Sequence, residues 1–156
     1  MEQSKITLKL SDNSNEDFKS LVVQLDKGLY DRYQSGQAQY EKYNRLEFLN
    51  TIVVAYENDQ PVGCGAYKVY DNQTVEIKRM FVAESHRGRG VSKLILSWLE
   101  EKAIEAGYSK SVLETGTKQN EAMGLYSKAG YMLTENYGQY KGMPLSICYE
   151  KDLTID

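Results

Sequence analysis

The spacing of hydrophobic and polar residues changes along the chain, and its first part predicts a strand followed by a helix. Ile6 to Leu10 alternates weakly between the two kinds of residue, which is typical of a strand. After a polar turn, hydrophobic residues recur at helical spacing from Phe18 to Leu29, and either Ser14 or Asn15 can cap that helix. The polar, tyrosine-rich stretch 30–45 fits neither period, so we predict no element there.

The middle of the chain has strand character throughout. Phe48–Tyr56, Pro61–Tyr70 and Thr74–Val82 are rich in strand-forming residues. Short polar turns separate them, and loops of this length join antiparallel neighbours. We therefore expect an antiparallel meander.

The last part alternates between helices and strands. A hydrophobic stripe from Val91 to Ala106 predicts a helix that ends at Gly107. A strand, a helix and two more strands are predicted after it: Ser111–Thr115, Asn120–Ala129, Tyr131–Glu135 and Leu145–Asp152. This order after a meander predicts a mixed α/β fold, and the length of 156 residues predicts one domain, 1–156.

Composition and charge exclude several classes of protein. A formal net charge of −3 argues against a nucleic-acid partner, because such proteins usually carry a basic surplus. Cys64 and Cys148 lack a CxxC neighbour and fit reduced thiols, and a single histidine argues against a metal site. With neither a signal-peptide pattern nor an apolar run of membrane length, we expect a cytoplasmic protein without a membrane partner.

The segment between the third meander strand and the next helix has the features of a phosphate-binding loop. Gly88 and Gly90 let the main chain turn tightly and bring bare amides close to a ligand. The first amides of the following helix lack internal partners and lie at the positive end of its dipole. Arg87 and Arg89 add positive charge. We predict that Arg87 to Ser92 binds the diphosphate of a nucleotide-type cofactor.

The spacing of this loop identifies the kind of cofactor. It fits neither GxGxxG nor the Walker motif, but it fits Gln/Arg-x-x-Gly-x-Gly/Ala, with Arg87, Gly90 and Ser92 in the fixed places. Ser92 is a departure, since glycine or alanine is usual there. With the segments EIKRMFV at 76–82 and NEAMGLYSKAGY at 120–131, the chain resembles the GNAT superfamily of acyl-CoA-dependent N-acyltransferases over roughly residues 48–152.

The resemblance implies both a fold and a binding mode for acetyl-CoA. The fold is a mixed, mainly antiparallel sheet of about seven strands flanked by helices, with a V-shaped splay between the strands 74–82 and 111–115. The pantetheine arm would bond to the main chain near Met80, Phe81 and Val82, and to Asn120, which also caps its helix. The diphosphate would meet the amides of six residues: Arg87, Gly88, Arg89, Gly90, Val91 and Ser92.

In this family the acceptor amine attacks the thioester directly, and the resemblance assigns two catalytic roles. Tyr126 would protonate the leaving thiolate, since a phenol pKa of about 10 is close to that of an alkyl thiol; a core tyrosine is the alternative. Glu76 would be the general base, on one strand face with Lys78, Met80 and Val82 by simple alternation. An ion pair of Glu76 with Lys78 or another cation, or a base role for ordered water, stays open.

Two other titratable residues, Glu114 and His86, are weaker candidates for a catalytic role. Glu114 ends a predicted strand, and we favour a solvated strand end over a residue that faces the substrate. His86 is the only histidine and lies in the phosphate loop, so we interpret it as a loop residue and not as a catalytic base.

We infer the class of acceptor from tyrosines in two regions of the chain. In the family that this chain resembles, these regions form the walls of the acceptor site. The tyrosines are Tyr30, Tyr33, Tyr40, Tyr43, Tyr137 and Tyr140. An aromatic, mildly acidic pocket suits a small cationic amine or an amino acid. The alternatives are a protein or peptide N-acetyltransferase, a non-catalytic acyl-CoA-binding module and an RNA-associated protein. A homodimer is also open, because dimers are common in the family.

Overall fold

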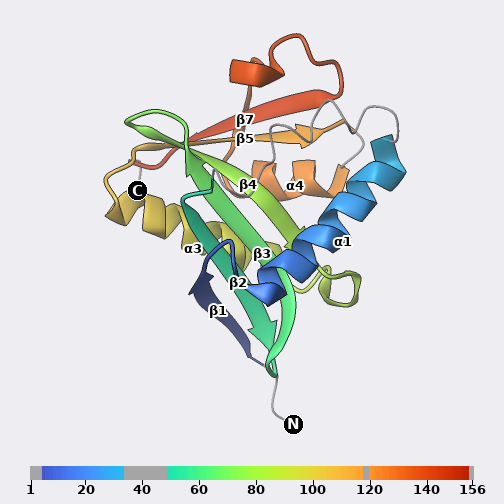
Figure 1. The fold of residues 1–156 in the computed structure, drawn as a ribbon. Helices are drawn as coiled ribbons and strands as arrows, with labels where there is room; N and C mark the ends of the chain where they lie inside the picture. Colours follow the sequence, from blue (N-terminus) through green and yellow to red (C-terminus); the bar gives the residue numbers. More distant parts are fainter. Residues whose placement is uncertain (1–4, 34–48, 118–119, 155–156) are drawn as a thin grey trace.

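The computed structural model describes residues 5–33, 49–117 and 120–154, and within them seven strands form one sheet in the order β1-β2-β3-β4-β5-β7-β6 (Figure 1). The strands are β1 (Ile6–Ser11), β2 (Thr51–Glu57), β3 (Gln60–Val69), β4 (Thr74–Val82), β5 (Lys110–Gly116), β6 (Met132–Thr134) and β7 (Ser146–Asp152). The α-helices are α1 (Glu16–Tyr33), α3 (Val91–Glu105) and α4 (Asn120–Lys128), and the short 3₁₀ helices are η3 (Glu84–His86) and η4 (Gly138–Tyr140). No helix in these ranges is long and apolar enough to span a membrane.

The pairing of the strands confirms the predicted mixed, mainly antiparallel sheet. β1 to β4 form an antiparallel meander, and β7 pairs antiparallel with both β5 and β6. Only β4 and β5 are parallel among the described pairs, and α3 provides the crossover that a parallel pair requires.

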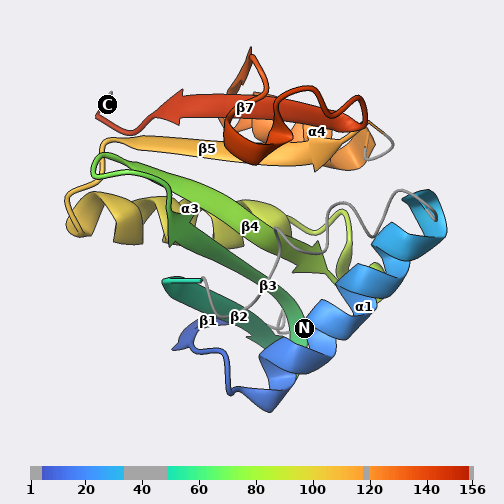
Figure 2. The same ribbon diagram turned by 45° about the horizontal axis from the view of Figure 1, so that its top comes forward.

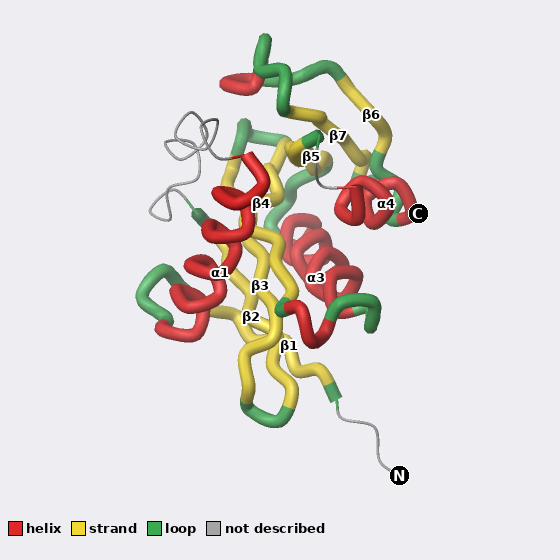
Figure 3. The backbone as a smooth tube through the Cα atoms, turned by 90° about the vertical axis from the view of Figure 1, so that its right-hand side faces the viewer, coloured by secondary structure: helices red, strands yellow, loops and turns green. Residues whose placement is uncertain are grey.

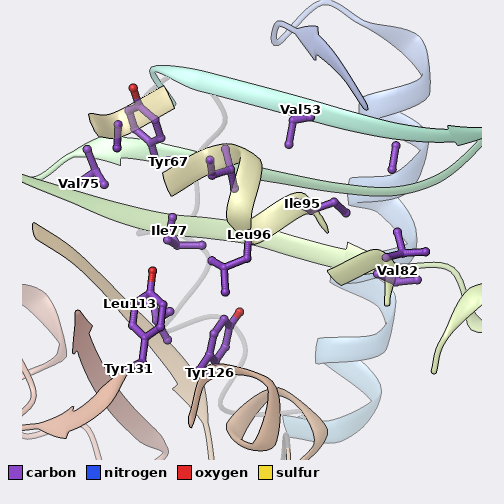
Figure 4. Close-up of a cluster of buried hydrophobic side chains, with 14 of the residues drawn as sticks. Val53, Tyr67, Val75, Ile77, Val82, Ile95, Leu96, Leu113, Tyr126 and Tyr131 are labelled. Atoms are coloured by element: carbon purple, nitrogen blue, oxygen red, sulfur yellow. The ribbon is translucent and has the colours of Figure 1, made fainter. Parts of the chain in front are cut away.

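The helices cover both faces of the sheet (Figure 3), because alternate residues of each strand point to opposite sides. On one face, Phe18 and Leu21 of α1 pack against Ile52, Val54 and other residues of β2 and β3. On the other face, α3 and α4 pack on the larger core, shown in Figure 4, which includes Val53 and Ala55 of the same strand β2. The binary pattern of the central strands therefore reports burial on two sides.

A β-bulge interrupts β4 at Arg79. Ala66 of β3 pairs with Lys78, whereas Cys64 pairs with Phe81, so β4 has one more residue than β3 over this interval. Arg79 has a φ of +59°, a left-handed conformation that is unusual for a residue with a side chain. An extra residue of this kind bends a strand and increases its twist.

The bulge corrects the strand face predicted for Glu76. Simple alternation placed Glu76 and Lys78 on the face of Met80 and Val82, and this was wrong. Met80 and Val82 pack in the core under α3, as Ile77 does before the bulge. The left-handed residue shifts the alternation by one position, so Glu76 and Lys78 lie on the opposite face.

The predicted splay between the central strands is confirmed. β4 and β5 pair from Thr74↔Lys110 to Ile77↔Leu113 and no further, although both strands continue beyond these residues. Figure 2 shows the two strands diverging at this end of the sheet. The bulge begins two residues after Ile77, and its bend carries β4 away from β5.

Gly65, opposite the bulge, provides a test of this packing. A Cβ atom there would lie 2.6 Å from Ile95 Cγ2 and 2.7 Å from Met80 Sδ. We expect Gly65→Ala to lower the free energy of unfolding by about 1–3 kcal/mol, the usual cost of overpacking a core. Gly28→Ala in α1, where nothing lies within 4 Å, is the control and should instead stabilise by about 0.5–1 kcal/mol. Denaturant titration of both variants measures the difference, and equal effects would contradict the prediction.

Candidate active site

The loop between β4 and α3 has the backbone form that its sequence predicts. Gly88 and Gly90 have φ values of +77° and +79°, which glycine adopts without strain. Gly90 is the N-cap of α3, and no side chain caps the helix. The first amides of α3 are therefore left for a ligand or for solvent, at the positive end of the helix dipole.

The Arg87 side chain turns back onto the strand that precedes the loop. Its Nε donates a hydrogen bond of 3.0 Å to the carbonyl oxygen of Val82, and its guanidinium lies 5.8 Å from the ring centre of Phe81. The strand end and the loop are thus joined by the first residue of the motif.

His86 and Arg89 share one carboxylate on the neighbouring β2–β3 hairpin. Glu57 Oε1 lies 2.9 Å from His86 Nε2, and Glu57 Oε2 accepts a hydrogen bond of 2.6 Å from Arg89. These two hydrogen bonds lower the pKa of Glu57, so it stays ionised at neutral pH. The sequence did not single out Glu57, because its partners come from a distant part of the chain.

Charged residues gather at the vertex of the splay, on the face away from α3. Ile77 and Leu113 form the last pair of β4 and β5. Lys78 and Glu114 are the next residues of the two strands, and by alternation they share a face with Glu76. Two buried or partly buried carboxylates and one buried ammonium therefore meet where the strands separate.

Glu76, the base predicted from the sequence, is almost completely enclosed. Its side chain is 1% exposed, and its Oε2 accepts a hydrogen bond of 2.7 Å from the Tyr137 hydroxyl. Its Oε1 lies 4.0 Å from Lys78 Nζ and has no hydrogen-bond partner among the described residues. Lys78 donates in turn to the hydroxyl of Tyr140 at 2.9 Å. The ion pair with Lys78, which the sequence left open as the alternative to a base role for Glu76, is thus present, and burial lowers the pKa of Lys78.

Glu114 differs from the solvated strand end that the sequence favoured. It is partly buried, and its Oε2 accepts a hydrogen bond of 2.6 Å from Ser146. Burial raises its pKa to about 7, although the Ser146 hydrogen bond and the charge of Lys78 act in the opposite direction. The sequence carries no direct signal for this, since the burial depends on how the other strands and the loop before β7 pack around β5.

Tyr126 approaches the splay from the other face of the sheet. It is 5% exposed and packs in the core with the rings of Tyr131 and Tyr149, at 5.8 and 6.2 Å between ring centres. In Figure 4 its side chain points from α4 towards Leu96 of α3. Burial raises the pKa of Tyr126 above its ordinary value, and the charge of Glu114 raises it further. A buried phenol and a titratable carboxylate therefore interact across the splay.

The loop before β7 covers the charged cluster. The Tyr137 ring packs edge-on against Tyr70 and Tyr140, at 5.3 and 5.5 Å between centres. The side-chain amide of Asn136 donates to the carbonyl oxygens of Tyr140, Met143 and Ser146, at 3.1, 3.2 and 3.2 Å. One amide thus fixes the shape of the loop that places Tyr137 and Tyr140 over Glu76 and Lys78.

Some predicted site residues lie outside what the structure describes. Asn120 begins α4, as predicted, but its side chain is not among those described, and the same holds for Tyr30 and Tyr33 of α1. Tyr40 and Tyr43 fall in the range 34–48, outside the described residues. Their roles stay predictions.

Comparison with known proteins gives consistent results. The model of a family described as the acetyltransferase (GNAT) family matches residues 16–131. An IAA acetyltransferase of Azospirillum brasilense is 34% identical over 141 residues, which are 85% of this chain and 88% of that protein.

Solved structures share the fold over nearly the whole chain. A Klebsiella pneumoniae protein assigned to the acyl-CoA N-acyltransferases has a TM-score of 0.81 and 26% identity, covering 95% of this chain and 97% of its own. A GNAT family acetyltransferase from Elizabethkingia anophelis with acetyl-CoA bound has a TM-score of 0.68 and 22% identity, covering 94% and 97%.

Proposed function

Because this chain belongs to the GNAT family of acetyltransferases, we propose that it moves an acetyl group from acetyl-CoA to a primary amine of a small molecule or an amino acid. One observation carries the proposal: β4 leaves β5 after Ile77 and then leads directly into the capless, glycine-rich start of α3. In this proposal the acyl-CoA cleft lies where the two strands separate, and the anion site lies at the start of α3, the next α-helix along the chain.

The donor would lie along that strand. Met80, Phe81 and Val82 lie beyond the part of β4 that pairs with β5, so on that side an extended pantetheine arm can hydrogen-bond to the main chain as an added strand does. The amides from Arg87 to Ser92 then bind the diphosphate at the start of α3. The Elizabethkingia structure, which has the same fold, contains acetyl-CoA.

Tyr126 donates the proton that the leaving CoA thiolate needs. A phenol is protonated at neutral pH even at its ordinary pKa of about 10. Burial, and then the negative charge of Glu114, raise the pKa of Tyr126 further, so it is a weaker acid while Glu114 is ionised. When Glu114 takes up a proton, this contribution disappears and Tyr126 becomes a stronger acid. Removal of the proton from the amine therefore favours protonation of the thiolate.

Glu114 is the general base that the geometry supports better than Glu76. A base works best when its pKa lies near the operating pH, and that of Glu114 is about 7. It also stands at the vertex, whereas Glu76 is enclosed and accepts a hydrogen bond from Tyr137. Glu76, the base predicted from the sequence, is the second candidate, and otherwise acts through its charge on Glu114.

The acceptor binds on the side of the charged cluster. The ring of Tyr137 and the buried ring of Tyr140 pack over this side, where the carboxylates of Glu76 and Glu114 stand beside the ammonium of Lys78. Aromatic rings beside negative charge attract a small cationic amine. These features favour a small amine over a long basic peptide as the substrate.

Tyr126→Phe tests the proposed acid. We expect kcat to fall by about 10²–10³-fold with little change in KM, because general acid catalysis contributes on this scale and the ring is retained. The measurement is release of the CoA thiol. Tyr149→Phe removes a hydroxyl from the ring that packs against Tyr126, and this control should keep its turnover. Unchanged kcat in Tyr126→Phe would exclude the assignment.

The pH dependence of the rate distinguishes the two carboxylates. In the wild type, kcat/KM should rise with pH through about 7, as Glu114 loses its proton. Glu114→Gln should abolish this limb. Glu76→Gln should shift it to lower pH, because losing a nearby negative charge makes Glu114 easier to ionise. Loss of the limb in Glu76→Gln and its survival in Glu114→Gln would make Glu76 the base.

A panel of acceptors tests the substrate class. Small primary amines, amino acids and lysine-containing peptides are compared at equal concentration for release of the CoA thiol. We expect the small amines to react fastest. Reaction with peptides alone would contradict the proposal, and CoA binding without thiol release for any amine would indicate a non-catalytic binding module.

A further inference from the structure

The diphosphate loop, residues 83–90 between β4 and α3, contacts the β2–β3 hairpin through one carboxylate at the end of β2. Glu57 uses one oxygen for His86 and the other for Arg89, on either side of the turn at Arg87 and Gly88. Its side chain is 14% exposed, whereas that of Arg89 is 47% exposed. An ion pair with one partner half in solvent adds little to the stability of the whole fold, so the effect of these contacts is local to the loop.

The loop needs such a fixed point. Main-chain hydrogen bonds hold its first part, the 3₁₀ helix η3, whereas the part from Arg87 to Gly90 contains two glycines with positive φ and leads into a helix without a side-chain cap. A loop that must become ordered on binding weakens the affinity for the ligand. The side chains of His86, Arg87 and Arg89 in this loop form hydrogen bonds to Glu57 or to the carbonyl oxygen of Val82, and these bonds restrain the loop.

The charge of Glu57 points to the same role. A carboxylate close to a diphosphate site repels the ligand, and its lowered pKa keeps it ionised. It also neutralises Arg89, which the sequence alone suggests as a partner of the phosphates. Because the charge of Glu57 opposes the binding of a diphosphate, Glu57 can favour binding only through the shape of the loop.

We propose that Glu57 is a positioning residue that holds the diphosphate loop in its binding conformation, and that Arg89 and His86 serve it as anchors. This inference rests on the proposed binding of acetyl-CoA. It assigns the recognition of the diphosphate mainly to main-chain amides, with the side chains of the motif directed to the loop itself.

The test compares two glutamates of equal charge. Glu57→Gln should weaken CoA binding by about tenfold, measured by calorimetry, because the loop must then be ordered by the ligand. Glu84→Gln is the matched control, since Glu84 is exposed on the same loop and no hydrogen bond or ion pair of its side chain is found among the described residues. It removes the same charge without removing a contact, and CoA binding should not weaken.

A shortened donor separates the loop from the rest of the site. Acetyl-pantetheine lacks the diphosphate, so its kcat/KM should be the same in Glu57→Gln and in the wild type, while KM for acetyl-CoA rises and kcat does not change. An equal loss with both donors would show a general effect on the fold and overturn the inference. Tighter CoA binding in both glutamate variants would overturn it as well, because charge alone would then decide.

Arg89→Met removes the same contact from the side of Arg89. The Arg89 side chain is 47% exposed, so the fold should tolerate the change. The variant should weaken CoA binding too, and the double variant with Glu57→Gln should lose less than the sum of both effects. If Arg89→Met weakens binding while Glu57→Gln strengthens it, Arg89 binds the phosphates directly and the inference fails. Absence of CoA binding in the wild type would instead contradict the proposed function.

Discussion

The site depends on a single backbone irregularity, the left-handed residue at Arg79. It adds a residue to β4, reverses the faces of the strand and bends it away from β5. The bulge has its own supports: the Arg79 side chain forms an ion pair of 2.5 Å with Asp26 of α1, and Cys64 Sγ donates to the Arg79 carbonyl oxygen at 3.4 Å. The bend follows the last paired residues of β4 and β5, so it explains why the parallel pairing ends there.

The charged cluster at the vertex shows what the bend makes room for. Burying charges is costly unless partners replace the water. Here tyrosine and serine hydroxyls provide several of the hydrogen bonds, and Lys78 partly balances the carboxylates. These partners do not fully offset the burial of Glu114, which raises its pKa to about 7. Burial disfavours the ionised form of Glu114, which costs free energy. The same effect raises the pKa and lets Glu114 accept a proton near neutral pH.

Most of the fold follows from local signals in the sequence. The periods of hydrophobic residues place the strands and helices within a few residues. Of the two predicted caps of α1, Ser14 and Asn15, it is Asn15 that accepts a hydrogen bond of 2.8 Å from the Phe18 amide. The phosphate loop is also local, since its glycines and the helix start are consecutive. The bulge was missed because alternation assumes a regular strand. The environments of Glu114 and Glu57 were missed because their partners lie about thirty residues away or more along the chain.

The short pairing of β4 with β5 also divides the molecule by task. The loop between β4 and α3 belongs to the half of the sheet that ends with β4. The tyrosine-bearing loop before β7 belongs to the half that begins with β5. Asn136 holds that second loop together with three hydrogen bonds of its own. Outward-facing positions between Gly138 and Leu145 can therefore change without disturbing the half of the sheet that carries the proposed donor site, so a change of acceptor needs no change in how the donor is held.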